Sequence, residues 1–160
     1  MSAGQTQPIE IRPAKAEDAA QIARLANALD LHEGLGGRVF TEGRVLRDGF
    51  GLDPAFGVLV AGRPGDDGRV LAYLLWHWAY DTDRALRKFW VSDIFVAEEA
   101  RGQGIGGALL KRAEAMAREA GAGSIALAVR EDNLAAIRFY EALGFAGKAV
   151  LMEKGLAPLP

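Results

Sequence analysis

The sequence predicts an α/β protein whose mixed sheet is antiparallel at first and parallel around a glycine-rich loop, with helices packed against it. Two observations carry this prediction. Up to residue 96, runs of strand length are joined by turns rich in Gly, Pro and Asp, and after it strands alternate with amphipathic helices. Hairpins give antiparallel pairs, whereas a strand–helix–strand unit gives a parallel pair. The predicted order is therefore β-α-α-β-β-β-α-β-α-β.

The first three elements are a strand and two helices. Ile9–Pro13 alternates apolar and polar residues, as a half-buried strand does. Ala16–Leu29 has apolar residues at helical spacing and acidic residues in its first turn, which suits a helix N-terminus. Thr41 is a candidate N-cap for a second helix that reaches about Asp48.

Three strands follow as successive hairpins. Gly57–Ala61 and Val70–Tyr80 are joined by Arg63–Gly68, the stretch of the chain richest in turn residues. A second turn at Asp81–Arg84 leads into Arg87–Val96, the third of these strands.

The remaining chain alternates helix and strand. Ile105–Ala120 carries an apolar stripe at helical spacing, and Ile125–Val129 is a continuous apolar run, typical of a strand covered on both faces. Asn133–Leu143 is the fourth predicted helix and Phe145–Met152 the last predicted strand. No linker or repeat divides the chain, so we expect a single domain over residues 1–160.

Composition excludes several classes of protein. A net charge of -2 gives no general attraction to nucleic acid or to an anionic membrane. No apolar run approaches the roughly 20 residues that span a bilayer, and Met1–Pro8 does not resemble a signal peptide. The chain has no cysteine, which excludes disulfides, thiolate metal sites and a cysteine nucleophile. We expect a cytoplasmic protein without nucleic-acid or membrane partners.

The stretch Asp93–Leu110 carries the clearest chemical signal. An apolar strand leads through an acidic turn into a glycine-rich loop that opens directly into a helix. Unpaired amides at a helix start, together with loop amides that no side chain screens, form an anion site. Arg101 adds a cation that can bind phosphate oxygens with two parallel hydrogen bonds. The loop is predicted to bind a pyrophosphate group through Gly102, Gly104, Gly106 and Gly107.

Three other interpretations of this loop were weighed. Residues 102–107 match G-x-G-x-x-G, but five residues separate the strand from the first glycine, and only 53 residues follow Gly107, too few for a second nucleotide-binding half. A P-loop is excluded because no Lys-Ser or Lys-Thr follows the glycines. A loop whose glycines serve only tight packing stays open as an alternative, although Arg101 favours phosphate.

Two segments resemble the signatures of a known family. Residues 96–110 resemble the acetyl-CoA signature Arg/Gln-x-x-Gly-x-Gly/Ala of the GNAT acetyltransferases, with Arg101, Gly104 and Gly106 in its three positions. Asn133–Phe145 resembles the second signature of that family, and the resemblance extends from residue 11 to about residue 152. It implies a mostly antiparallel central sheet of 6–7 strands, about four helices packed on it, and a splay between strands 4 and 5. It also implies acetyl-CoA as co-substrate, no metal, and a homodimer.

Within the family, the chain looks most like the diamine, polyamine and thialysine branch. The similar stretches are Ile11–Ala14, Asp48–Gly51, Tyr80-Asp81 and the segment from Asp93 to Gly106. Three departures from the branch weaken the prediction of a polycationic substrate, but a primary amine remains the predicted substrate. Ser92 stands where the branch usually has Glu. The aromatic residue that follows Tyr-Asp in the branch is missing, and Arg84 brings a positive charge nearby. The last predicted strand lacks the tryptophan found in the branch.

The resemblance assigns roles to the residues that match its motifs. The phenol of Tyr140 would lie beside the CoA sulfur and protonate the departing thiolate, although an aromatic residue at helical spacing is also a usual core residue. Asn133 could cap its helix, hydrogen-bond the cofactor, or do both. The implied cofactor-binding residues are Ile94, Phe95, Val96, Arg101, Gly102, Gln103, Gly104, Ile105, Gly106, Gly107, Asn133 and Tyr140.

An amine acceptor needs a group that binds or deprotonates it, because an alkylamine with a pKa near 10.4 is only about one part in a thousand neutral at pH 7. Asp93 is the first candidate for this role, with a structural carboxylate at the sheet edge as the alternative. Glu33 and Asp81 match acidic positions of the branch and could hold the cation, and Ser92 could position a water.

The acetyl group is expected to pass directly to the amine within a ternary complex, because the sequence offers no cysteine and no activated serine. A backbone N–H between residues 94 and 96 would polarise the thioester carbonyl, which requires a β-bulge that the resemblance implies.

Two further patterns concern the histidines. His77 and Asp81 form an H-x-x-x-D pair, found in another class of CoA acyltransferase, but the pattern is short and a packed histidine is the more common explanation. His32 and His77 lie far apart in sequence, so no metal site is predicted. The alternatives to an N-acetyltransferase are a non-catalytic acyl-CoA-binding sensor of the same fold and, less favoured, an NAD-binding protein.

Overall fold

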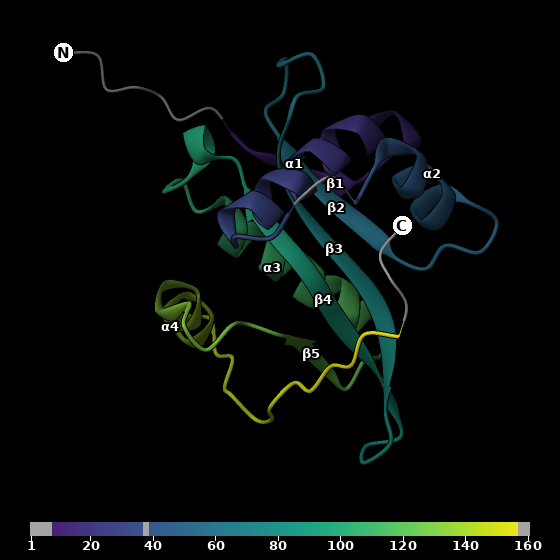
Figure 1. The fold of residues 1–160 in the computed structure, drawn as a ribbon, viewed down its shortest axis with the longest axis vertical. Helices are drawn as coiled ribbons and strands as arrows, with labels where there is room; N and C mark the ends of the chain where they lie inside the picture. The colour runs from purple at the N-terminus through teal and green to yellow at the C-terminus, as the bar shows by residue number, and fades with distance from the viewer. Residues whose placement is uncertain (1–7, 37–38, 157–160) are drawn as a thin grey trace.

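The structure is a computed structural model and describes residues 8–36 and 39–156. Its centre is a five-stranded sheet in which the order of the strands in space equals their order in the chain (Figure 1). The first four strands pair antiparallel and the last two pair parallel, so the predicted mixed sheet is confirmed. The strands are β1 (Glu10–Pro13), β2 (Gly57–Gly62), β3 (Val70–Asp81), β4 (Leu86–Val96) and β5 (Ser124–Leu127).

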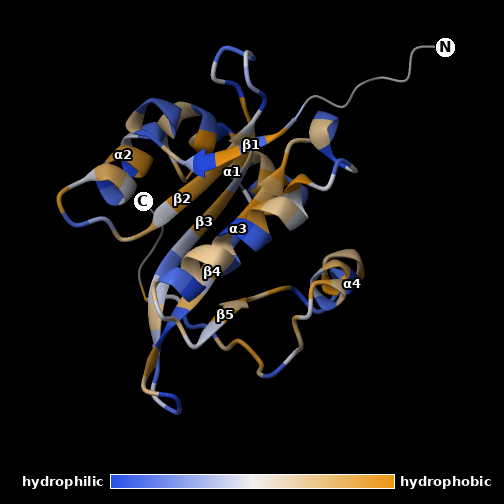
Figure 2. Cartoon of the chain, turned by 180° about the vertical axis from the view of Figure 1, so that it is seen from behind, coloured by the Kyte–Doolittle hydropathy of each residue, from blue (hydrophilic) through white to orange (hydrophobic). Residues whose placement is uncertain are grey.

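Helices cover both faces of this sheet. α1 (Ala19–His32) and α2 (Glu42–Phe50) lie on one face, and α3 (Ile105–Glu119) lies on the other (Figure 1). Figure 2, seen from behind, shows α3 in front of the sheet, with hydrophilic and hydrophobic residues interspersed along it. α4 (Leu134–Ala142) stands beside β5, at the edge of the sheet.

The core is split by the sheet into two layers. Successive residues of a strand point to opposite faces. Tyr73 of β3 accordingly packs with α1, while its neighbour Leu74 packs with α3, and both are fully buried. On β4, Phe95 belongs to the α1 layer and Phe89 to the α3 layer. β4 therefore has a packed residue on each side and holds its position between the layers.

A buried ion pair ties the start of α1 to β1. Asp18, 2% exposed, accepts hydrogen bonds from Arg12 at 2.7 and 2.9 Å and from the Lys15 amide at 2.7 Å. Burial alone would raise the pKa of Asp18, but these hydrogen bonds outweigh it, and the pKa lies below its ordinary value. The pair fixes the direction in which α1 crosses the sheet, and α1 ends beside the cavity described below.

The predicted helices are confirmed to within a few residues. The first begins with a short 3-10 turn, Ala16–Asp18, and continues as α1. Thr41 caps α2, because its side chain accepts a hydrogen bond from the amide of Arg44 at 3.4 Å. Among the described residues, no helix is both long and apolar enough to cross a bilayer.

The last predicted strand, Phe145–Met152, is wrong, and the sheet has five strands rather than 6–7. An apolar run becomes a strand only when another strand accepts its backbone hydrogen bonds. Within the described residues this segment pairs with none, and its apolar side chains are exposed: Val150 by 78%, Leu151 by 66% and Met152 by 89%.

The predicted splay between strands 4 and 5 is confirmed by the register of the ladders. β5 pairs with β4 only from Lys88 to Val91. Beyond Val91, β4 is bound on one side by β3 and is open on the other. The expected bulge is also present: Leu75 lies opposite Asp93 and Trp76 opposite Val91, so Ser92 is the extra residue.

Candidate active site

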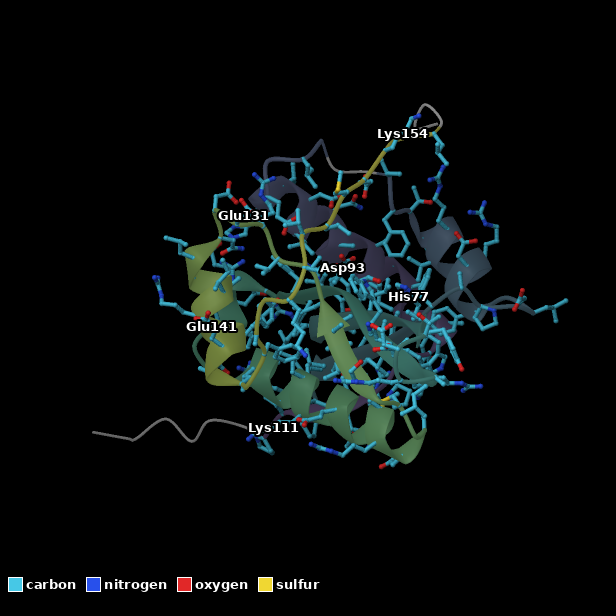
Figure 3. All side chains as sticks on the ribbon, turned by 90° about the horizontal axis from the view of Figure 1, so that it is seen from below. His77, Asp93, Lys111, Glu131, Glu141 and Lys154 are labelled. Atoms are coloured by element: carbon cyan, nitrogen blue, oxygen red, sulfur yellow. The ribbon has the colours of Figure 1, made fainter. Side chains whose placement is uncertain are left out.

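The splay opens into a cavity of about 1110 Å³ that runs along the free edge of β4. Its walls come from β4, the glycine loop, the segment between β5 and α4, α4 itself, the end of α1 and residues 149–151. Seen from below (Figure 3), Asp93 lies in the interior of the molecule, whereas Glu131 and Glu141 lie towards the periphery on the α4 side. Six residues of β4, from Val91 to Val96, line the cavity, a span of roughly 17 Å for a strand.

One end of the cavity is formed by the glycine loop. Gly102 and Gly104 have φ values of +74° and +76°, a left-handed conformation that favours glycine. The first helical bond of α3 runs from the Ala108 amide to the Gly104 carbonyl at 3.0 Å. The amides of residues 105–107 precede that bond and have no acceptor within the helix. Both loop glycines and residues 105–107 line the cavity, which makes this end suitable for an anion.

Arg101 lies at the rim of the same end. Its Nε donates to the Val96 carbonyl at 3.1 Å, and its guanidinium carbon lies 5.3 Å from the centre of the Phe95 ring. Among the described residues it forms no ion pair with a carboxylate. Gln103, by contrast, does not line the cavity: its side chain accepts from Arg63 at 2.9 Å and anchors the loop to the β2–β3 turn.

The open edge of β4 offers backbone donors. The Ala97 amide donates to the Leu71 carbonyl on β3 at 2.8 Å. Because amides of a strand alternate in direction, the Phe95 amide also faces β3, and those of Ile94 and Val96 face the open side. The Val96 carbonyl accepts a hydrogen bond from Arg101, whereas the amides of Ile94 and Val96 remain directed to the cavity.

α4 brings Tyr140 and Asn133 to the opposite wall. Asn133 caps α4, since its side chain accepts from the Ala136 amide at 3.1 Å, and it also lines the cavity. The Tyr140 ring lies 5.3 Å from Phe139 and 5.9 Å from Phe145. Burial first, and the charge of Glu33 second, raise the pKa of the Tyr140 phenol, so this residue holds its proton at neutral pH.

The other end of the cavity is acidic. Asp93 is half-buried, and Tyr73 donates its hydroxyl to Asp93 Oδ2 at 3.4 Å. Burial raises the pKa of Asp93, the Tyr73 hydrogen bond lowers it, and the charges of Asp30 and Glu33 raise it, leaving it above its ordinary value. Glu33 follows the end of α1 and lines the cavity as well, so carboxylates from two elements meet here.

Ser92 and Asp81 end up in different places. Ser92, the bulge residue, lines the cavity, and its Oγ lies 3.0 Å from His77 Nδ1. Asp81 lies outside the cavity lining, where it pairs with Lys88 at 3.3 Å and accepts from the amides of the β3–β4 turn. Burial alone would raise the pKa of Asp81, but the hydrogen bond and the charge of Lys88 outweigh it, and the pKa lies below its ordinary value. The H-x-x-x-D pair is therefore not formed, because the partner of His77 is Ser92.

Some residues that line the cavity were not predicted from the sequence. The segment after β5 contributes Arg130 and Glu131, and α1 contributes His32. The position of the first two was a usable signal, because ligands of open α/β sheets bind beyond the carboxyl ends of the strands. Phe139 closes the wall at the glycine loop: its Cζ lies 3.4 Å from where a Cβ on Gly106 would be. Among the described residues, no group of three or more His, Cys, Asp or Glu could hold a metal ion.

Comparison with known proteins identifies the class to which this fold and cavity belong. The Acetyltransferase (GNAT) family matches residues 31–145, and the chain belongs to that family. It is an acetyltransferase by class, and members of the family use acetyl-CoA.

Particular relatives narrow the similarity to one branch. The chain is 37% identical over 142 residues to the thialysine N-epsilon-acetyltransferase of Bos taurus, an alignment that covers 85% of this chain and 83% of the relative. It is 29% identical over 140 residues to the human spermidine/spermine N(1)-acetyltransferase-like protein 1, covering 84% of this chain and 20% of that protein. A crystal structure of a possible acetyltransferase from Clostridium difficile 630 shares the fold, with a TM-score of 0.78, 23% identity, and 94% of this chain and 98% of that one covered.

Proposed function

We propose that the protein transfers the acetyl group of acetyl-CoA directly to a primary amine of a small molecule, within a ternary complex. One observation carries the proposal: a single cavity along β4 has a backbone anion site at one end and carboxylates at the other. A donor with a diphosphate and an acceptor that is a cation would enter opposite ends of this cavity. Similarity to acetyltransferases named for thialysine and for spermidine or spermine supports an amine as acceptor.

The cofactor half fits acetyl-CoA on three counts. Residues 104–107 offer amides without helical acceptors, Arg101 offers a cation without an ion-pair partner among the described residues, and the edge of β4 offers unpaired amides. The loop would hold the diphosphate. The edge of β4 would hydrogen-bond the amide-containing arm as an added strand does.

The acceptor half fits an ammonium group. Asp93 and Glu33 would bind the cation, and Asp93 would bring its nitrogen beside Ile94. The Ile94 or Val96 amide would stabilise the negative charge that develops on the thioester oxygen. Tyr140 would then give its proton to the departing sulfur, whose reference pKa lies close enough to that of a phenol for the transfer.

The test combines binding with turnover. Isothermal titration with CoA is expected to give one site per chain, and thiol release from acetyl-CoA is expected with at least one amine in a panel of thialysine, spermidine, an aminoglycoside and a short peptide. CoA binding without turnover of any amine would favour the acyl-CoA sensor instead. A chain that does not bind CoA would overturn both.

The homodimer and the cytoplasmic location stay predictions. Light scattering of the purified chain tests the first, and fractionation of the cells that express it tests the second.

A further inference from the structure

We propose that Ser92 and His77 form the path by which the acceptor amine loses its proton. The inference rests on the proposed function and adds a proton acceptor to it. The H-x-x-x-D pattern had singled out His77, yet neither that pattern nor the residues assigned above give it a role.

The geometry places a hydroxyl inside the cavity and an imidazole behind it. Ser92 is the extra residue of the β4 bulge, next to Asp93, and it lines the cavity. His77, on β3, does not line it but lies 3.0 Å from Ser92 Oγ through its Nδ1. A bulge changes the direction of a side chain within a ladder. Here it lets Ser92 face the acceptor while keeping a hydrogen bond to the neighbouring strand.

Asp93 binds a cation well but is poorly placed to pass a proton to water. Its hydrogen-bond partner is Tyr73, which is fully buried. Burial and the charge of Asp93 raise the pKa of the Tyr73 phenol far above its ordinary value, so Tyr73 stays a donor and accepts nothing from Asp93. A proton taken by Asp93 would have to leave through the cavity, where the acceptor is bound, because the hydrogen-bond partner of Asp93 is the buried Tyr73.

His77 offers an exit that does not pass through the cavity. Its side chain is only half-buried, and its Nε2 has no hydrogen-bond partner among the described residues. Imidazole is also the side chain suited to accept and release a proton near neutral pH. The path therefore runs from the amine to Ser92 Oγ, to His77 Nδ1, and from Nε2 to solvent.

The step balances as follows. With its proton on Nε2, His77 accepts the Ser92 hydroxyl proton at Nδ1 while Ser92 Oγ takes one proton from the ammonium. The neutral nitrogen then forms the C–N bond, the C–S bond breaks, and the nitrogen loses a second proton. The first proton lost by nitrogen leaves through His77 to solvent. The second passes to water in the cavity, and Tyr140, after protonating the thiolate, regains a proton from that water, so that one proton is released for each turnover. Electrons are not exchanged, and no further reactant is needed.

A nucleophilic Ser92 is the competing use of the same pair. A serine nucleophile needs a base that a third group orients. Asp81, the nearest candidate in sequence, is paired with Lys88 instead. We therefore assign Ser92 to proton transfer rather than to an acetyl-enzyme.

The experiment uses two acceptors that differ in basicity but little in shape. One is the preferred alkylamine of the wild type, and the other is its β,β-difluoro analogue, whose ammonium is far more acidic, so that in the mildly alkaline buffer used for both it is largely uncharged and needs no deprotonation before it attacks the thioester. His77→Gln keeps a hydrogen-bonding side chain without a basic nitrogen. We expect it to lower kcat for the alkylamine about 100-fold, the lower range for general base catalysis, and to leave kcat for the fluoroamine nearly unchanged. Ser92→Ala should behave alike, and Ser124→Ala, on β5 outside the cavity, is the matched serine control.

Three outcomes would overturn the path. Equal losses on both amines would mean that His77 has a structural role, which a lower thermal midpoint would accompany. An unchanged alkylamine rate in His77→Gln would mean that Asp93 or water alone takes the proton. Acetylated Ser92, found by mass spectrometry after incubation with acetyl-CoA alone, would mean a nucleophile. Wild-type turnover of either amine supports the proposed function whatever the variants do, so the two failures are told apart.

Discussion

The two ends of the cavity are built in different ways. The end proposed for the cofactor is made of main chain: left-handed glycines, helix-start amides and the open edge of β4, all within residues 94–107. The end proposed for the acceptor is lined by side chains from separate elements, Glu33 after α1 and Ser92 with Asp93 on β4, and His77 on β3 contacts Ser92 from behind the lining. A site of the first kind can be recognised from a short motif, and it tolerates change in side chains. A site of the second kind depends on the register of the strands, and single substitutions should alter what it accepts.

Tyr140 is the proposed proton donor to the departing sulfur, so its loss should have the largest effect. Tyr140→Phe removes the proton donor and keeps the ring. We expect kcat to fall about 100-fold or more, the usual contribution of a general acid, while the Kd for CoA measured by titration stays the same. The matched control is Tyr80→Phe, at an exposed position of β3 outside the cavity lining, which should leave kcat unchanged. An intact kcat in Tyr140→Phe would remove the acid role.

Asp93→Asn should affect the acceptor end alone. A hydrogen bond to a charged group contributes about 1.5–3 kcal/mol, so we expect KM for the amine to rise about ten- to a hundredfold, without a change in CoA affinity. A comparable loss of CoA affinity would show that the two ends are not separate.

The same variant should be more stable than the wild type at neutral pH. The pKa of Asp93 is raised in the folded state, which means that the ionised carboxylate destabilises the folded chain relative to the protonated carboxyl. Below the ordinary aspartate pKa, both folded and unfolded chains are protonated, and the variant gains nothing. As pH rises through the raised pKa, the wild type bears the cost of a buried charge. The thermal midpoint of Asp93→Asn should therefore exceed that of the wild type at pH 7 but not in acid, whereas Asp53→Asn, an exposed carboxyl, should match the wild type at both.

Gly104→Ala should affect the cofactor end alone and by less. A Cβ there would meet no atom within 4 Å, so the cost comes only from the backbone at φ +76°. That cost is about 1–2 kcal/mol, and relaxation of the loop should weaken CoA binding about tenfold in a titration. Gly121→Ala is a matched control, with φ +70°, equal free space and a place beyond the other end of α3. It should lose similar stability and keep its CoA affinity, and equal loss of affinity in both would argue against the loop as the binding site.

The difference between a site made of main chain and a site made of side chains also explains which parts of the molecule could be predicted from the sequence. Gly104 and Arg101 were found because a glycine-rich turn before an amphipathic stripe is a local pattern with a local cause. Asp81 was expected at the acceptor end, but the long β3–β4 hairpin carries it away from the cavity, to Lys88. The contact of Ser92 with His77 follows from a one-residue bulge, which no periodicity in the sequence reveals.

The strand count failed for a related reason. Ala149–Met152 has the composition of a strand. Such a composition shows that the side chains would fit a pleated surface, but it does not show that another strand is present to pair with. β5 was predicted correctly because the helix before it returns the chain to the sheet beside β4. After α4 no such constraint acts on the described chain.

Strand order has a consequence for how the protein assembles. The pairings of β2 with β3 and of β3 with β4 close short hairpin loops and cost little chain entropy, whereas β1 pairs with β2 across α1 and α2. β5 likewise returns across a helix, α3, to pair with β4. Chains dominated by local pairings fold fast, and distant pairings come late. The cavity opens beside one of the two pairings that close across helices, so the hairpins of the sheet should form before the cavity is complete, and a nascent chain that has not yet docked β5 lacks one side of it.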